Sequence, residues 1–173
     1  MYRLVCVSRI AAFLGSALVA QQPDPKVATL SRAEQTFIQD AAKANQDEIA
    51  MGRLAQKSSN PQVKSYGDKL VADHTSVQKE LENLAAAKGV TLETYDATSS
   101  NEYNRLSAMT GAAFDRSFAA RAVRDHQKAI SMYTGALRNA HDPELRTYIN
   151  NTLPHLRMHL TEAEMLERGL GKG

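Results

Sequence analysis

Four stretches of the chain place apolar residues alternately three and four positions apart, which is the spacing that lines one face of an α-helix. They cover residues 31–58, 61–88, 111–139 and 143–168. Each stretch is long enough for about seven helical turns, and a stripe of that length is buried only by packing against other helices. The spacing therefore predicts an all-α protein with a single domain, residues 31–170, built from four long helices.

Capping residues predict where these helices begin. Ser31 and Glu34 have the spacing of a capping box, in which each side chain accepts a hydrogen bond from a free backbone N–H group of the first turn. Residues 60–66 and 142–148 begin with Asn-Pro and Asp-Pro, and they match in residue character at all seven positions. The first residue of such a pair acts as the N-cap, and proline takes the first helical position. The repeat indicates two similar helical hairpins.

A connector, residues 90–110, separates the two hairpins, and its length decides the topology. An up-down-up-down bundle needs only short loops. Within the connector, residues 99–102 have another capping-box spacing, which predicts a short helix. That helix and the extended chain beside it would span the ~42 Å length of a long helix. We therefore predict a ferritin-like four-helix bundle, with a long crossover containing a short helix between the second and third long helices.

The first twenty residues have the layout of a secretory signal peptide. Arg3 and Arg9 supply positive charge, and residues 10–20 are mostly apolar. An uncleaved anchor would need about 20 apolar residues to cross a bilayer, and this stretch has about eleven. We expect residues 1–20 to direct export and residues 21–30 to form a flexible leader. The mature protein would then be periplasmic or otherwise extracytoplasmic, with no integral membrane span.

Charge and cysteine content exclude several classes of function. The chain has 21 basic and 19 acidic residues, but two of the basic residues lie in the predicted signal peptide, so the mature charges balance. A protein with this balance has no overall field that attracts nucleic acid. The single cysteine, Cys6, also lies in the signal peptide, which leaves no thiolate for a disulfide, a metal site or a nucleophile. We expect no nucleic-acid partner. The charge balance does not exclude a protein partner in the envelope.

Four polar residues interrupt the apolar stripes, one on each long helix. Glu48 and His74 lie 12 and 13 residues from the Asn-Pro pair, and His126 and His159 each lie 16 residues from the Asp-Pro pair. If the two hairpin turns lie at opposite ends of the bundle, these counts place all four side chains within about one helical turn of the same level. His155 shares a face with His159 because the two are four residues apart, which makes it a secondary candidate for a metal ligand in this layer.

This polar layer has two interpretations. Imidazole and carboxylate ligands suit zinc, iron, manganese or copper, so the layer would hold a single divalent transition metal ion. Alternatively, the histidines are structural, for example through a hydrogen bond between His74 and Glu48 that fixes the register of the helices. The protein would then be a non-enzymatic envelope structural or interaction module. The sequence contains no nucleophile elbow or phosphate loop, so we do not predict an enzyme.

Several strings of the sequence resemble one known family. They are Asn45-Gln-Asp-Glu-Ile-Ala-Met-Gly-Arg-Leu-Ala55, Ala72-Asp-His-Thr75, Asp125-His126 and Leu153-Pro-His-Leu-Arg-Met-His-Leu160. In this order they resemble the bacterial domain of unknown function 4142 family, over about residues 31–170. The resemblance implies export and a ferritin-like four-helix fold, in proteins often labelled outer-membrane proteins, but no established activity.

The resemblance places the recurrent polar positions of the family at Glu48, His74, His126 and His159. Ferritin-like di-iron proteins are a different comparison, because their site needs a glutamate on two helices and a Glu-x-x-His motif on the other two. Val71 and Leu156 stand where that motif needs glutamate, three residues before His74 and His159. We therefore expect no di-iron centre.

Overall fold

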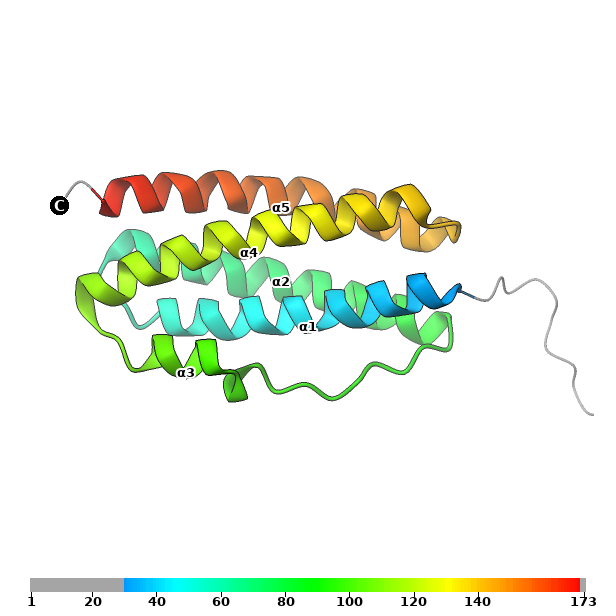
Figure 1. Cartoon of the computed structure of the whole chain (residues 1–173), viewed down its shortest axis with the longest axis horizontal. Coiled ribbons are helices and arrows are strands. Elements are labelled where there is room, and N and C mark those ends of the chain that lie inside the picture. The colour runs from blue at the N-terminus through cyan, green and yellow to red at the C-terminus, as the bar shows by residue number, and fades with distance from the viewer. Residues whose placement is uncertain (1–29, 172–173) are drawn as a thin grey trace, which may run out of the picture.

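The computed structural model describes residues 30–171, which form an elongated bundle of helices (Figure 1). The helices are α1 Arg32–Ala55, α2 Pro61–Ala87, α3 Asn101–Ser107, α4 Gly111–Asn139 and α5 Pro143–Leu170, with a 3₁₀ turn at Ala97–Ser99. No strand occurs among the described residues. The predicted all-α bundle of four long helices is confirmed. The predicted signal peptide, residues 1–20, and all of the leader except Leu30 lie outside the described residues.

The long helices begin at the residues whose side chains cap them. Ser31 Oγ accepts a hydrogen bond from Glu34 N, and the Glu34 carboxylate accepts one from Ser31 N, which completes the capping box. Asn60 and Asp142 each accept two backbone hydrogen bonds from the first turns of α2 and α5. Helix α1 ends at Ala55, before the predicted end at residue 58, because the chain tightens there into hydrogen bonds between residues three apart.

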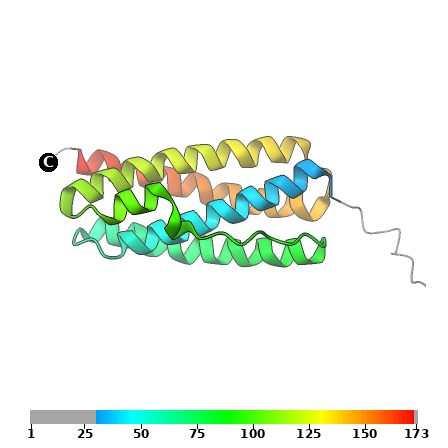
Figure 2. The ribbon, with the colours of Figure 1, turned by 60° about the horizontal axis from the view of Figure 1, so that its bottom comes forward.

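The segment between α2 and α4 runs along the bundle beside α1 (Figures 1 and 2). Near the start of α1, Gln39 donates to the carbonyl oxygen of Thr91 and accepts from Glu93 N. Further along, the Tyr95 hydroxyl donates to the Asp47 carboxylate at 2.7 Å. The segment is therefore the predicted crossover, and the α1–α2 turn and the α4–α5 turn lie at opposite ends of the bundle.

Polar contacts join three segments at the end that carries the α4–α5 turn. Oε1 of Glu34 accepts hydrogen bonds from the backbone N–H groups of His141 and Asp142, at 2.8 and 2.9 Å. Lys88, just after α2, pairs with the Asp142 carboxylate at 2.7 Å, and both side chains are largely buried. These contacts hold the start of α1, the end of α2 and the α4–α5 turn together.

Helices α1 and α2 approach each other closely at two glycines. A Cβ atom added to Gly67 would lie 2.7 Å from the carbonyl oxygen of Gly52 and 2.7 Å from the Cβ atom of Ala55. A Cβ atom added to Gly52 would lie 2.9 Å from the carbonyl oxygen of Gly67. Because both residues lack a side chain, the two backbones come into contact here, and this contact sets the spacing of the hairpin.

Two apolar clusters fill the interior of the bundle, one towards each end. Each draws on the four long helices, for example through Phe37, Leu81, Tyr133 and Ile149 in one cluster and Met51, Leu70, Phe118 and Ala163 in the other. On each of the four long helices, buried polar residues lie between the two clusters, among them Asn45, Glu48, His74, His126 and His159. The polar layer predicted from the sequence therefore lies in the middle of the bundle, between two apolar regions.

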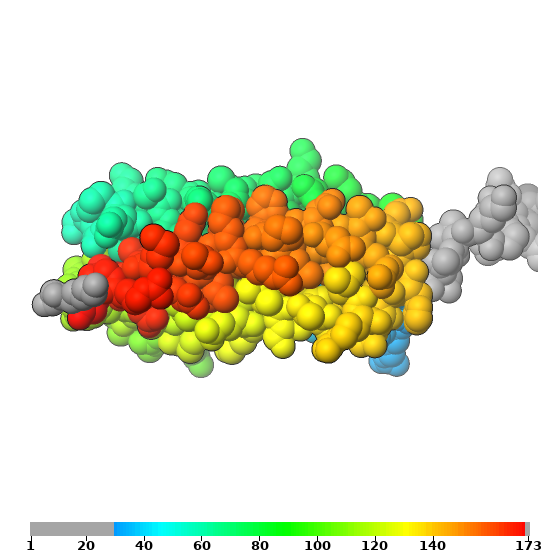
Figure 3. Space-filling model, turned by 90° about the horizontal axis from the view of Figure 1, so that it is seen from above, coloured from blue at the N-terminus to red at the C-terminus, as the bar shows by residue number. Residues whose placement is uncertain are grey.

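One face of the molecule is covered by α5, which lies between α2 and α4 (Figure 3). Met158 and Met165 of α5 are large apolar residues that remain exposed. In the part of the chain that the structure describes, no helix combines the length and the apolar character needed to cross a membrane.

Glu34→Gln is expected to destabilise the protein at neutral pH and much less in acid. Burial alone would raise the pKa of Glu34, but backbone N–H groups of Asp142, Ser31 and His141 donate to its carboxylate and lower that pKa to about 2, from an ordinary value of 4.5. The resulting stability is present above pH 4.5 and is lost as the pH falls towards 2. We expect the substitution to reduce the free energy of unfolding by ~2 kcal/mol at neutral pH.

Urea unfolding of the parent protein and the Glu34→Gln variant, repeated from neutral pH into the acid range, measures this difference. Glu164→Gln is the matched control, because Glu164 is a partly exposed residue of α5 that pairs with Arg168 only at 3.9 Å. A loss of stability in Glu34→Gln that does not shrink as the pH falls would show that the carboxylate charge is not its source.

Candidate metal centre

Three histidines from three different helices meet in the polar layer. His74 of α2, His126 of α4 and His159 of α5 are 4%, 1% and 1% exposed. Their ring centroids lie between 5.3 and 5.7 Å apart, and one nitrogen atom of each ring lies within 4.8 Å of the corresponding atoms of the other two. The three rings therefore lie at the same height along the bundle, as the number of residues from each hairpin turn predicts. That prediction assumes the crossover topology, which the chain has.

A chain of hydrogen bonds fixes the protonation of His74. An ionised carboxylate only accepts hydrogen bonds, so Gln78 donates to Glu82 through its Nε2 atom, at 2.9 Å. Oε1 of Gln78 then accepts from Nδ2 of Asn45 at 3.3 Å, and this turns Oδ1 of Asn45 towards Nδ1 of His74, at 3.1 Å. The network assigns the proton of His74 to Nδ1, and Nε2 keeps a free lone pair.

His126 and His159 face acceptors that do not donate. Nδ1 of His126 lies 2.9 Å from the backbone oxygen of Ala122, one turn earlier in α4. Nε2 of His159 lies 2.8 Å from a carboxylate oxygen of Asp73 on α2. Each of these nitrogens donates, which leaves Nε2 of His126 and Nδ1 of His159 with lone pairs. Metal-binding histidines usually have one nitrogen held in this way by a carboxylate or a backbone carbonyl.

The three lone pairs lie close together without hydrogen-bond partners. Nε2 of His74, Nε2 of His126 and Nδ1 of His159 are buried, and none of them has a partner among residues 30–171. An unpaired buried acceptor costs about 1 to 3 kcal/mol, so three in one place require a group that interacts with all of them. A transition metal ion accepts nitrogen lone pairs at about 2.0 to 2.1 Å. The donor set therefore fits such an ion.

Burial also favours the neutral form of two of these rings, His74 and His159. Desolvation, followed by the neighbouring His126 and His159, lowers the pKa of His74 well below its ordinary value of 6.5. Desolvation likewise lowers the pKa of His159, although hydrogen bonding to the Asp73 carboxylate acts in the opposite direction. Neutral imidazole is the form that binds a metal ion, so these two rings are ready for ligation at neutral pH.

Glu48 and His155, also proposed from the sequence, are placed differently from the three histidines. Glu48 is buried in the same layer, and burial raises the pKa of its carboxyl group while His126 lowers it. Among the described residues, however, the atoms that converge within 4.8 Å belong to the histidines and not to Glu48. The expected hydrogen bond from His74 to Glu48 is wrong, because Asn45 accepts from that ring instead. His155 is exposed and lies outside the layer.

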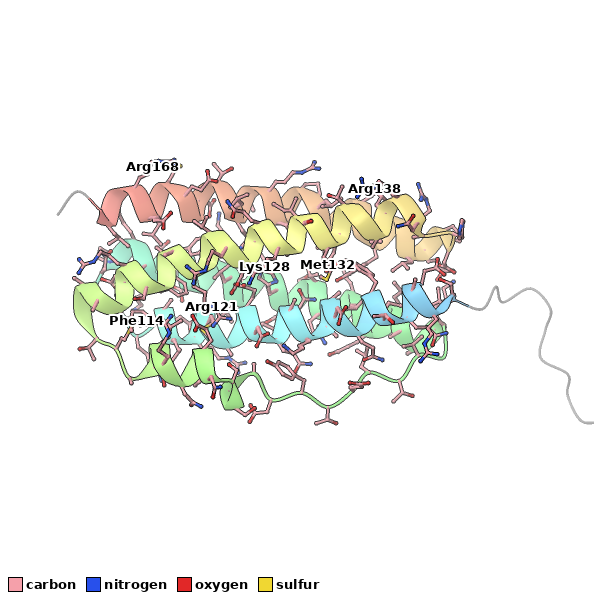
Figure 4. All side chains as sticks on the ribbon, viewed as in Figure 1. Phe114, Arg121, Lys128, Met132, Arg138 and Arg168 are labelled. Atoms are coloured by element: carbon pink, nitrogen blue, oxygen red, sulfur yellow. The ribbon has the colours of Figure 1, made fainter. Side chains whose placement is uncertain are left out.

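A cavity of about 270 Å³ lies beside the histidines, between α1 and α4. In Figure 4, Arg121, Lys128 and Met132 lie on the side of α4 that faces α1, and all three line the cavity. Its walls also include the buried residues Glu48 and His126. Because Lys128 is exposed, the cavity connects the surface of the bundle with the histidine layer.

The residues that orient the imidazoles were not predicted from the sequence. Asn45 stands three residues before Glu48, and Gln78 stands four residues after His74, so helical spacing places each on the face of a residue already identified. The sequence alone could therefore have identified Asn45 and Gln78 as neighbours of the polar layer. Asp73 offers no such signal, because its partner His159 is 86 residues away along the chain.

Most of the chain matches one family model. The model describes a domain of unknown function, DUF4142, and the match covers residues 19–166. Among proteins of curated function, none matches the chain.

Solved structures with the same architecture belong to several proteins. A DUF305 fragment from Deinococcus radiodurans has a TM-score of 0.72 and 17% sequence identity, over 84% of this chain and 100% of the fragment. CopM in the Cu(I)-bound form has a TM-score of 0.66 and 19% identity, over 79% of this chain and 96% of CopM. A conserved hypothetical protein from Mycobacterium tuberculosis has a TM-score of 0.61 and 16% identity, over 78% and 96%. At these identities the likeness concerns the fold alone.

Proposed function

Because the chain belongs to the DUF4142 family, whose description names no function, we propose a function from the site itself: the protein binds one divalent transition metal ion through His74, His126 and His159. The observation that carries this proposal is the meeting of three buried imidazole lone pairs, each on a ring whose other nitrogen is held by a hydrogen bond. In a structural layer completed by the protein alone, these atoms would pair with its own polar groups.

The donor set favours some metals over others. Neutral imidazoles suit zinc, copper and iron, whereas manganese prefers carboxylate and water oxygens. CopM, one of the structural neighbours, has been solved in Cu(I)-bound, Cu(II)-bound and Ag-bound forms. This supports copper, together with zinc, as the first ion to test.

Three histidines leave room for a further ligand. Four-coordinate sites with three protein ligands keep one position for water or another molecule. Glu48 lines the cavity next to His74 and His126 and is the residue best placed to approach that position. We therefore propose Glu48 as an additional metal ligand that moves towards the ion when the ion is bound.

We also propose that the protein works outside the cytoplasm. The basic and apolar character of residues 1–20 supports export. The buried donors, held on rigid helices, suit retention of a metal ion. The role that fits best is metal binding in the bacterial envelope, for storage, sensing or protection, rather than catalysis.

The metal content of the purified mature protein tests the proposal. After equilibrium dialysis against zinc, copper, iron or manganese, we expect about one copper or zinc ion per chain, measured by elemental mass spectrometry. His155→Ala is the control, because it removes an exposed histidine one turn from His159 and should leave the metal content unchanged. If none of these metals is taken up in a stoichiometric amount, the histidine layer is structural and the protein is a scaffold or an interaction module.

A further inference from the structure

The guanidinium group of Arg121 is buried and only partly paired. The residue is 8% exposed. Nε of Arg121 donates to the Asp125 carboxylate on the same helix at 2.6 Å, but Nη1 is buried and has no hydrogen-bond partner within the described part of the chain. Arginine stays protonated in proteins, and a buried charged donor without a partner is costly. The position of Nη1 therefore calls for a ligand that accepts a hydrogen bond.

Arg121 lines the same cavity as the proposed metal site. His74 and His126 contribute to its walls, and so do Arg121 and Lys128 of α4 (Figure 4). A volume of about 270 Å³ suits a small molecule or ion rather than a ligand of drug size. A ligand in this cavity would adjoin both the histidine layer and the guanidinium group.

Charge balance identifies the class of ligand. The cavity walls carry two cationic side chains, Arg121 and Lys128, and three carboxylates, Asp47, Glu48 and Asp125. With Glu48 ionised as a metal ligand, the walls have one excess negative charge, and the bound divalent ion turns this into one excess positive charge. In a partly buried site, an excess charge attracts a counter-ion strongly because water screens it less. The metal-loaded cavity thus lacks one negative charge.

We propose that the cavity between α1 and α4 binds one small monovalent anion, such as a carboxylate, which accepts a hydrogen bond from Arg121 and binds the metal ion as a fifth ligand beside the three histidines and Glu48. This inference rests on the proposed function, because the metal ion supplies the additional positive charge. The planar guanidinium group matches the geometry of a carboxylate, and carboxylate oxygens are also ligands of zinc. Anion binding is therefore expected in the metal-loaded protein and not in the metal-free protein.

Azide titration of the Cu(II)-loaded protein, followed by visible absorption, tests the proposal. Azide is a small monovalent anion, and its coordination to Cu(II) changes the spectrum. We expect Arg121→Met to keep its metal and to bind azide at least about tenfold more weakly than the parent protein. Arg124→Met is the matched control, because it removes an exposed arginine of the same helix, and its azide affinity should stay within about twofold of the parent value.

The design separates failure of the anion site from failure of the metal site. Metal content is measured first in each protein, and Arg121→Gln, which also removes the positive charge, replaces Arg121→Met in the comparison if the latter takes up no metal. Equal azide affinity in the metal-loaded parent and Arg121 variants would overturn the proposal. The proposal would also fail if Arg121→Met weakened the binding of imidazole, a neutral ligand, as much as that of azide. Such a result would indicate a disturbed metal centre rather than a lost anion contact. Absence of metal from all the proteins would instead contradict the proposed function.

Discussion

His126→Leu is expected to abolish metal binding while leaving the metal-free protein at least as stable as the parent. His126 is 1% exposed, so leucine would be fully packed at this position. The substitution removes an unpaired buried nitrogen, which costs about 1 to 3 kcal/mol. The substitution also removes the hydrogen bond from the His126 ring to the Ala122 carbonyl oxygen. That oxygen still accepts the regular helical hydrogen bond from the backbone N–H group of residue 126, so it keeps a partner. We therefore expect a metal affinity at least about a hundredfold lower, with a metal-free free energy of unfolding about 1 kcal/mol higher.

Denaturant unfolding with added metal or with a chelator measures both effects. A metal present at 1,000 times its dissociation constant stabilises the native state by about 4 kcal/mol, so the two curves should separate for the parent protein and coincide for His126→Leu. His155→Leu is the control and should behave like the parent. If metal-free His126→Leu is less stable than the metal-free parent by more than about 2 kcal/mol, His126 is a structural residue and the metal proposal loses its main support.

Gly67→Ala is expected to destabilise the protein by about 3 kcal/mol. The added methyl group would lie 2.7 Å from the Gly52 carbonyl oxygen and 2.7 Å from the Cβ atom of Ala55, and neither neighbour is the end of a flexible side chain. Helices α1 and α2 must then separate, which opens the interface along the hairpin. Asn45 and His74 lie two turns away from these glycines, so their 3.1 Å hydrogen bond should lengthen as well. Metal affinity should therefore fall together with stability.

Gly135→Ala provides the matched control for this prediction. Gly135 also lies inside a long helix, α4, but a Cβ atom added there meets nothing within 4 Å among the described residues. Alanine favours the helix over glycine by about 1 kcal/mol, so this variant should be slightly more stable than the parent. Thermal and denaturant unfolding of both variants measure the contrast. Equal stabilities for Gly67→Ala and the parent would show that the two backbones do not meet as closely as the structure indicates.

The positions and order of the helices follow from short-range signals in the sequence. The capping box at Ser31 and the two Asx-Pro pairs act on neighbouring backbone groups, so their effect does not depend on distant contacts. The length of the connector then determines that the second hairpin is inverted relative to the first. Once this topology is given, the level of the three histidines follows from the constant rise of an α-helix.

The details of the site depend on contacts that residue spacing does not specify. Glu48 lies at the predicted level, yet Asn45 is the residue of α1 that reaches His74. Which side chain does so depends on the rotation of α1 about its own axis, and the close packing of Gly52 against Gly67 fixes that rotation. The tautomers of the histidines depend in turn on hydrogen bonds made after the helices have packed.

The three metal-ligand candidates are divided unequally between the two hairpins. His74 belongs to the first hairpin, and His126 and His159 belong to the second. Neither hairpin alone presents all three nitrogens, so an ion held by them would be a cross-link between two halves of the chain. On the proposed function, capture of the ion and docking of the halves would form one coupled equilibrium. Removing the ion should speed amide hydrogen exchange first along the seam where the hairpins meet, before the turns at either end.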